Sequence, residues 1–199
     1  ITDAGIQSLT NALQGLQSFK ELLLDNNEIG DGGIEAIATT LLPSVRTLET
    51  LNVGFNQISA SGIKTLMKAV DDYPSLRSLS VSGNTIDTST ARAISYALSF
   101  NRSLDSVSFV HCDIDQEAKR LISSGIVSNC RSKLRQLAGF ELGPVIVALG
   151  FPAALEQWNN AQILSFLRLM WDNSGDCGEE EEKSDPLYYL DDNAARSTP

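Results

Sequence analysis

The sequence predicts an α/β fold, a solenoid in which short parallel strands line one face and helices line the other. Two observations support this prediction. One mainly apolar pattern returns along the chain at a spacing of 28 or 29 residues, and each copy is followed by a stretch whose apolar residues have helical spacing. A fixed period of this size indicates one strand-and-helix unit stacked on copies of itself.

The repeated pattern has five slots, four of them apolar. The copies hold Phe19, Leu22, Leu24, Asn27 and Ile29; Leu48, Leu51, Val53, Asn56 and Ile58; Leu76, Leu79, Val81, Asn84 and Ile86; and Leu104, Val107, Phe109, Cys112 and Ile114. The second and third slots are two residues apart, which is the spacing of side chains on one face of a strand. We therefore expect one short strand in each copy, with these two side chains in the core.

The fourth slot is expected to lie in the turn after each strand. It contains Asn27, Asn56, Asn84 and Cys112. A buried turn leaves backbone groups that need partners, and a side-chain amide offers both donors and an acceptor. Cys112 is a smaller and weaker substitute. These four residues are predicted to form a structural ladder.

A helix is predicted after each strand, with one buried stripe facing the sheet. The stripes are Ile6, Leu9 and Leu13; Ile34, Ile37 and Leu41; Ile63, Leu66 and Val70; and Ala91, Ile94 and Leu98. Gly5, Gly33 and Gly62 come just before the first three stripes, where a tight turn or a close backbone approach is easiest for glycine.

The pattern L-x-x-L-x-L-x-x-N/C-x-L is the signature of the leucine-rich repeat. With a full helix in every unit, residues 1–130 resemble the ribonuclease-inhibitor-like class of these repeats, which is also found in Ran GTPase-activating protein, in the sensor regions of NOD-like receptors and in the tropomodulin C-terminal domain. The resemblance implies a horseshoe arc with a concave parallel sheet and convex helices. It implies little about function, because one fold hosts many functions.

Three regions are predicted along the chain. Residues 1–130 form the repeats, and because Ile1 occupies the slot of Ile29 and Ile58, we expect a fragment of a longer array that begins inside a repeat. Residues 131–173 form a degenerate terminal repeat and a helical cap, in which Gly139 and Leu142 replace the third apolar residue and the Asn. A helix is expected from Leu142 to Leu149, and another after an N-cap at Asn159 or Asn160. The cap would cover the open apolar end of the solenoid, and the alternative is a partner-binding helical module.

Residues 174–199 are predicted to be a disordered acidic tail. From Asp172 onward the chain has nine acidic and two basic residues, and its formal net charge is -10 overall. Such a composition cannot bury enough apolar surface to offset the entropy of ordering. Within the tail, Leu187, Tyr188, Tyr189 and Leu190 form a candidate motif for binding a partner.

The binding surface is predicted on the concave face, where residues between the apolar slots point outward. The candidates are Leu23, Asp25, Asn52, Phe55, Ser80, Ser82, Ser108, Val110 and His111. Most of them are small and polar. Binding energy concentrates in aromatic anchors, so Phe55 and His111 are the first candidates, although a singly exposed Phe also occurs without any function.

The sequence predicts no catalytic residues, no cofactor and no metal site. His111 is the single histidine, and as strand neighbours His111 and Cys112 would point to opposite faces. No cysteine and histidine set has zinc spacing, and no phosphate-binding glycine motif occurs. The three cysteines show no paired spacing, which favours a reducing, cytoplasmic location.

The most favoured function is therefore a non-catalytic protein-interaction scaffold that binds another protein through its concave face or rim. The acidic composition argues against nucleic acid. The absence of a long apolar run argues against a membrane, and no small-molecule substrate is predicted. Two alternatives follow from the resemblance: a GTPase-activating protein similar to that for Ran, and an actin-capping module resembling tropomodulin.

Overall fold

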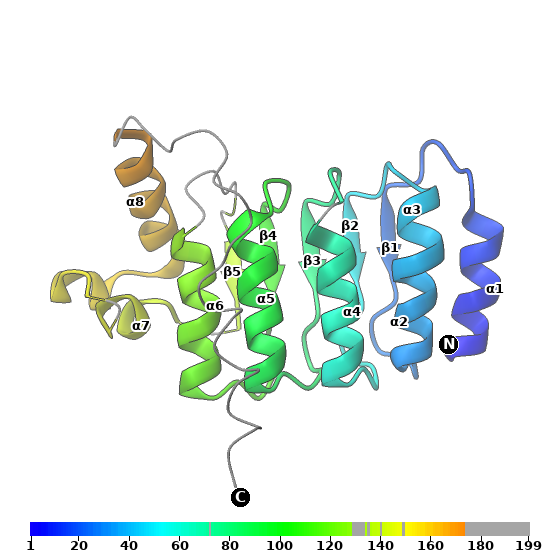
Figure 1. The fold of residues 1–199 in the computed structure, drawn as a ribbon, viewed down its shortest axis with the longest axis horizontal. Coiled ribbons are helices and arrows are strands. Elements are labelled where there is room, and N and C mark those ends of the chain that lie inside the picture. The colour runs from blue at the N-terminus through cyan, green and yellow to red at the C-terminus, as the bar shows by residue number, and fades with distance from the viewer. Residues whose placement is uncertain (72, 129–133, 135, 140, 149, 174–199) are drawn as a thin grey trace, which may run out of the picture.

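A five-stranded parallel sheet forms one layer of the molecule, and a row of helices covers one of its faces (Figure 1). This computed structural model describes residues 1–71, 73–128, 134, 136–139, 141–148 and 150–173. The strands follow one another in chain order: β1 (Glu21–Leu23), β2 (Thr50–Asn52), β3 (Ser78–Ser80), β4 (Ser106–Ser108) and β5 (Gln136–Ala138). The predicted parallel sheet is confirmed.

The helices alternate with the strands. In chain order they are α1 (Asp3–Leu13), α2 (Asp31–Ala36), a π-helical turn η1 (Ile37–Leu41), α3 (Leu42–Ser44), α4 (Ala60–Asp71), α5 (Thr88–Phe100), α6 (Gln116–Ser128), α7 (Gly143–Ala148), a 3-10 turn η2 (Ala153–Gln157) and α8 (Asn160–Asn173). In η1 the Leu42 nitrogen donates to the Ile37 oxygen, five residues back. Pro43 follows, and its missing N–H prevents an ordinary helical hydrogen bond at this point.

The core lies between the sheet and the helices. The central residue of each strand is paired in register with the next, so Leu22, Leu51, Leu79, Val107 and Leu137 form one buried row. The predicted stripes of α4 and α5 and of the helical run from α2 through η1 are buried beneath it. Leu9 and Leu13 of α1 are only partly buried, because α1 is the first helix of the row and has a neighbour on one side only (Figure 1).

Asparagine side chains connect successive turns. Asn56 Nδ2 donates to the oxygens of Val53 and Gly54 in its own turn and, at 2.9 Å, to that of Leu24 in the preceding turn. Its Oδ1 accepts from the Ile29 nitrogen. Asn84 makes the same four contacts one repeat later. At the next turn Cys112 Sγ contacts the Val81 oxygen at 3.5 Å.

In the turn after β5, the side-chain amide that bonds the backbone comes from Asn160 of α8. Asn160 Nδ2 donates to the Leu137 oxygen at 3.0 Å, and Asn160 Oδ1 accepts from the Leu142 nitrogen at 2.8 Å. Asn159 is the N-cap of α8: its Oδ1 accepts from the Gln162 nitrogen, and Gln162 Oε1 accepts from the Asn159 nitrogen. The two adjacent asparagines therefore have different tasks, one capping the helix and the other binding it to the sheet.

The C-terminal elements continue the same core. Leu142, Ile146, Leu155, Ile163 and Leu167 are buried in it. The predicted helix beginning near Leu142 is α7, and Trp158 packs edge-on against Phe166 with ring centroids 5.7 Å apart. The tail from residue 174, with its motif from Leu187 to Leu190, lies outside the described residues.

Candidate functional site

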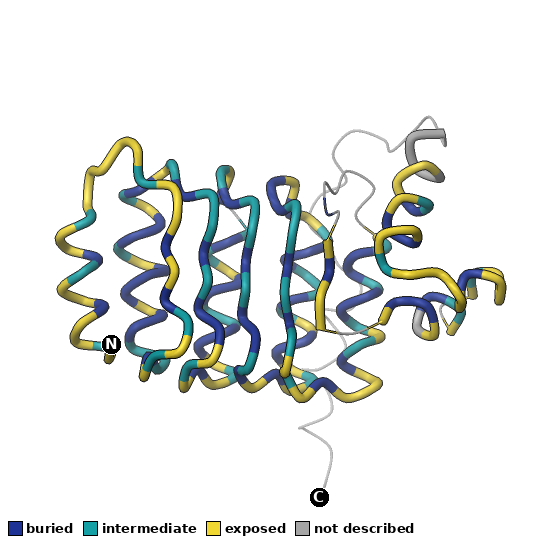
Figure 2. Tube along the Cα trace, turned by 180° about the vertical axis from the view of Figure 1, so that it is seen from behind, coloured by how far each residue is buried: buried dark blue, intermediate teal, exposed yellow. Residues whose placement is uncertain are grey.

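The sheet face away from the helices, called here the open sheet face, is built of small polar side chains. Leu23, Asn52, Ser80 and Ser108 share one row in register across β1 to β4. Asn52, Ser80 and Ser108 are half-buried, whereas Leu23 at the edge is 60% exposed. Figure 2 shows this gradient, with the middle strands less exposed than β1 and β5.

The polar groups of this face bind one another. Asn52 Nδ2 donates to Asp25 Oδ1 at 3.0 Å, which connects two repeats. Ser82 Oγ contacts Ser80 Oγ at 3.2 Å and Ser108 Oγ at 2.9 Å. Ser82 was expected on the exposed surface but is only 5% exposed, because it lies past the end of β3 between these two hydroxyls. Near the ends of the strands, this face therefore has side chains that are already hydrogen-bonded to one another.

A second row of residues lies in the turns that end the strands. Asn26, Phe55 and His111 have φ angles of 57°, 52° and 57°, and Gly83 has 67°. All four immediately precede the ladder position of their repeat. This left-handed backbone reverses the chain after the strand and turns the side chain at that position toward the rim. His111 and Cys112 therefore lie in a turn, and the sequence-based description of them as strand neighbours is wrong.

Phe55 and His111 contact each other although they come from repeats that are not adjacent. Their ring centroids are 5.7 Å apart and the planes are tilted by 54°. Gly83 lies in the repeat between them, and a Cβ there would approach Phe55 Cδ1 to 2.5 Å. The missing side chain of Gly83 therefore makes room for the Phe55 ring. We call Phe55, Gly83 and His111 the ring site, and its Phe55 side chain is 44% exposed.

The sequence named Phe55 and His111 separately and missed their contact. The signal was present, since both residues and Gly83 occupy the same position of successive repeats. Of the other candidates, Leu23, Asp25, Asn52, Ser80 and Ser108 lie on the open sheet face. Val110 is half-buried, and its oxygen accepts from the Gly83 nitrogen at 2.9 Å.

A groove lies at the opposite edge of the sheet, where the first three strands begin. Its volume is about 350 Å³, and it is lined by Gln17, Ser18, Lys20, Arg46, Thr47, Glu49, Ser75 and Arg77. Sequence reasoning missed this groove. The available signal was a basic residue shortly before each of the first three strands.

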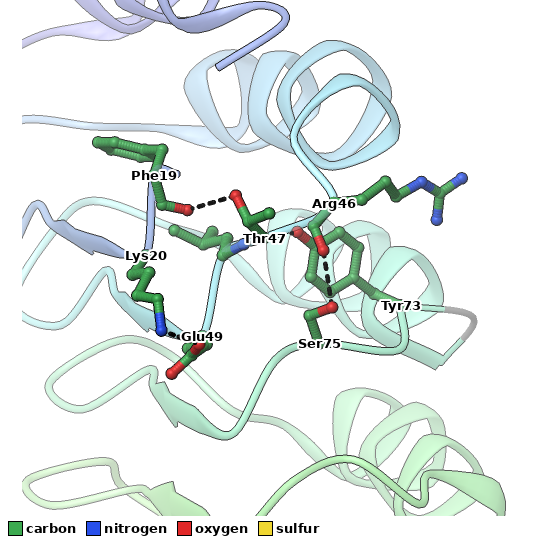
Figure 3. A network of polar contacts seen from close by, with 8 residues as sticks. Phe19, Lys20, Arg46, Thr47, Glu49, Tyr73 and Ser75 are labelled. Carbon is green, nitrogen blue, oxygen red and sulfur yellow. Dashed lines mark hydrogen bonds and ion pairs between the residues drawn. The ribbon is translucent and has the colours of Figure 1, made fainter. Parts of the chain in front are cut away.

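Figure 3 shows how the loops of this groove are held together. Thr47 Oγ1 donates to the Phe19 oxygen at 2.9 Å, and Ser75 Oγ donates to the Arg46 oxygen at 2.7 Å. Behind them the Tyr73 hydroxyl donates to the Val45 oxygen and accepts from the Leu48 nitrogen. Burial raises the pKa of Tyr73, which keeps the phenol neutral and able to donate.

The described residues contain no group of three or more histidine, cysteine or acidic side chains arranged to hold a metal ion. Burial raises the pKa of the Cys112 thiol. In the same part of the chain no helix has the length and apolar character needed to cross a membrane.

Comparison with known proteins agrees with the repeat pattern. Residues 15–38, 46–67 and 74–95 each match the family model of the leucine-rich repeat. A solved structure described as leiomodin-1 actin-binding site 2 is similar with a TM-score of 0.58 and 15% sequence identity, over 86% of this chain and 96% of that chain. No curated protein matches the sequence. The chain therefore contains leucine-rich repeats and folds as a solenoid of them with a helical C-terminal cap, and at this identity the leiomodin likeness bears on fold alone.

Proposed function

We propose that this chain is a non-catalytic protein-interaction module of the ribonuclease-inhibitor-like class, located in the cytoplasm, and that a protein partner binds over the ring site and the adjoining open sheet face. The carrying observation is the contact of Phe55 with His111 across Gly83, next to polar side chains of the open sheet face that are bound to one another. Paired, partly exposed aromatic rings on a rigid support are the kind of residue in which binding energy concentrates.

The surroundings of the ring site support this proposal. The turn beneath it is fixed by backbone hydrogen bonds from Phe55 to Ser82 at 2.7 Å and from Gly83 to Val110 at 2.9 Å. The rings are therefore held in place before a partner arrives, which lowers the entropic cost of association. The neighbouring serines are short and already paired, so a partner could approach the sheet closely.

The proposal is tested by photo-crosslinking with the full chain. Phe55 is replaced by p-benzoylphenylalanine, which preserves an aromatic ring. Phe100 of α5 provides a matched control, because it is 43% exposed and also contacts one aromatic neighbour, Tyr96. We expect a protein from cell lysate to crosslink at position 55 and not at position 100, and we expect His111→Glu in the same chain to abolish this crosslink. Equal crosslinking at both positions, or crosslinking at position 100 alone, would contradict the proposal.

A second candidate function is actin binding, because the structurally similar chain is described as actin-binding site 2 of leiomodin-1. Co-sedimentation of the full chain with actin filaments tests it directly. If actin is the partner at the ring site, the chain should pellet with the filaments, and Phe55→Glu combined with His111→Glu should return it to the supernatant. A chain that stays in the supernatant at saturating filament concentration excludes filament binding.

A further inference from the structure

The groove before β1, β2 and β3 is rich in basic side chains, and some of their hydrogen-bond donors have no partner within the described residues. Lys20, Arg46 and Arg77 line it, and Glu49 is the one acidic side chain among its lining residues. This local excess of positive charge stands in a chain whose formal net charge is -10. The Thr47 and Ser75 hydroxyls of the groove already donate to loop oxygens, so they fix its walls.

The three cationic side chains differ in how many of their N–H donors already have a partner within the protein. Lys20 Nζ lies 2.7 Å from Glu49 Oε1, and both side chains are well exposed, at 63% and 45%. Arg77 Nη1 donates to the Ser103 oxygen at 3.0 Å and keeps its other donors. Within the described part of the chain, the Arg46 guanidinium has no hydrogen bond or ion pair. Arginine presents a planar set of donors that matches a carboxylate, so both arginines can donate hydrogen bonds to an acidic side chain of a partner.

We infer that this groove is a docking site for an extended acidic segment of a partner protein. Lys20 and Arg77 hold equivalent positions two strands apart, which is about 10 Å at the usual strand spacing. An extended segment in the polyproline II conformation has three residues per turn and rises about 3.1 Å per residue, so its side chains three positions apart lie on one side at about the same distance. A segment crossing the strands would therefore place two acidic side chains, three positions apart, near Lys20 and Arg77. Glu49 lies at the equivalent position between them and favours a neutral or basic residue in the middle.

This inference rests on the proposed function, because it assigns a second contact to the same protein-binding module. The two surfaces lie at opposite ends of the strands, so their failures can be told apart. Loss of the ring-site crosslink would leave binding of an acidic peptide at the groove unaffected, and the reverse also holds.

The test uses a fluorescein-labelled peptide that contains pairs of glutamates separated by two serines, with the full chain and fluorescence anisotropy. We expect binding at low salt that weakens at physiological ionic strength, and a peptide with glutamine in place of glutamate should not bind. Arg46→Gln with Arg77→Gln should weaken binding at least about 10-fold, the scale expected for losing charge-assisted hydrogen bonds. Arg120→Gln, at an exposed position of α6, is the matched control.

Two further full-length variants sharpen the result. Glu49→Gln frees Lys20 and should tighten binding, whereas Phe55→Glu with His111→Glu should leave it unchanged. The inference is overturned if the glutamine peptide binds equally well or if the double arginine variant keeps its affinity while thermal unfolding shows it is folded. It is also overturned if replacing Glu179, Glu180, Glu181 and Glu182 with glutamine strongly tightens binding, because the chain's own acidic segment would then be the occupant.

Discussion

The first two repeats and the later ones use aspartate differently at the start of their helices. Asp3 and Asp31 lie two positions after the isoleucine slot, and each binds the following repeat: Asp3 Oδ1 accepts from the Gly30 nitrogen and Asp31 Oδ1 from the Ser59 nitrogen. Asp87 and Asp115 lie one position after that slot, and each accepts from the nitrogen three residues on in its own helix. A shift of one position changes a bridge between repeats into an N-cap.

Where an aspartate bridges to the following repeat, that repeat has a glycine in the first turn of its helix, next to the aspartate side chain. A Cβ at Gly33 would lie 2.8 Å from Asp3 Oδ1, and a Cβ at Gly62 would overlap Asp31 Oδ1. In the later repeats, where Asp87 and Asp115 cap their own helices, the equivalent positions hold Thr90 and Ala118. The earlier repeats are thus connected by aspartate as well as by asparagine. In the next repeat Asn84 makes the same contacts without a bridging aspartate, and the turn after β5 is held by Asn160 of α8.

The largest effect is expected from the asparagine ladder of the earlier repeats. Asn56→Ala removes three donated hydrogen bonds and one accepted bond, leaving turn groups without partners, and should lower the free energy of unfolding by about 2 to 3 kcal/mol. Chemical denaturation of the full chain measures it. The exposed neighbour Gln57→Ala is the control.

Cys112→Ala sharpens the comparison, because it removes a single weak contact at the same position of the fourth repeat. Its cost should be smaller than that of Asn56→Ala. Equal losses at the two positions would show that the amide contacts do not distinguish the repeats.

The next largest effect is expected at the turn after β5, whose backbone groups are hydrogen-bonded by the side-chain amide of Asn160 in α8. Asn160→Ala leaves the Leu142 nitrogen and the Leu137 oxygen without this partner and should cost about 1 to 2 kcal/mol. Hydrogen exchange should show that the loss of protection is confined to β5, α7 and α8. Asn159→Ala, which removes the cap alone, is the comparison. A protection loss that spreads evenly through β1 to β4 would contradict a local role.

Gly62→Ala tests the bridge between repeats through its steric requirement. Alanine in a helix is ordinarily more favourable than glycine by about 1 kcal/mol, but here the new methyl would meet Asp31 and approach Ile58 Cγ2 to 2.7 Å. We expect a net destabilisation of about 1 kcal/mol, seen as a lower Tm, and partial relief when Asp31→Ala is added.

Gly5→Ala is the matched control for Gly62→Ala. Gly5 holds the equivalent position in the first helix, and a Cβ there would meet only Ile1 Cγ2, at 2.9 Å. It should cost less than Gly62→Ala or be neutral. A Gly62→Ala variant that is more stable than the wild type would refute the steric argument.

These contrasts also show what could be predicted from the sequence. The strands, the buried stripes and the Asn27, Asn56 and Asn84 positions follow from a local period, because each repeat supplies its own slots. The contact of Phe55 with His111, the burial of Ser82 and the role of Asn160 depend on which repeats become neighbours in space and on side-chain geometry. The period gives the neighbours but not the rotamers, and α8 lies outside the period altogether.

The smallest effect is expected from the charge on the cap of α5. Hydrogen bonds to Asp87 from the Thr90 side chain, the Thr90 nitrogen and the Ser89 side chain lower its pKa from 3.8 to about 2. A carboxyl group whose pKa is lower in the folded state stabilises the fold above its ordinary pKa, and this contribution is lost as the pH falls through about 2.

Asp87→Asn keeps a good N-cap and removes only the charge. Because Asp87 is exposed, the wild type should exceed this variant in stability by less than about 1 kcal/mol at neutral pH. The difference should shrink as the pH falls from about 4 toward 2. Denaturation at several pH values measures it, with Asp113→Asn as the control for net charge. A difference that stays constant down to the lowest pH would mean that the charge on Asp87 contributes nothing to the cap, and that the later repeats hold their helices by the neutral hydrogen bonds alone.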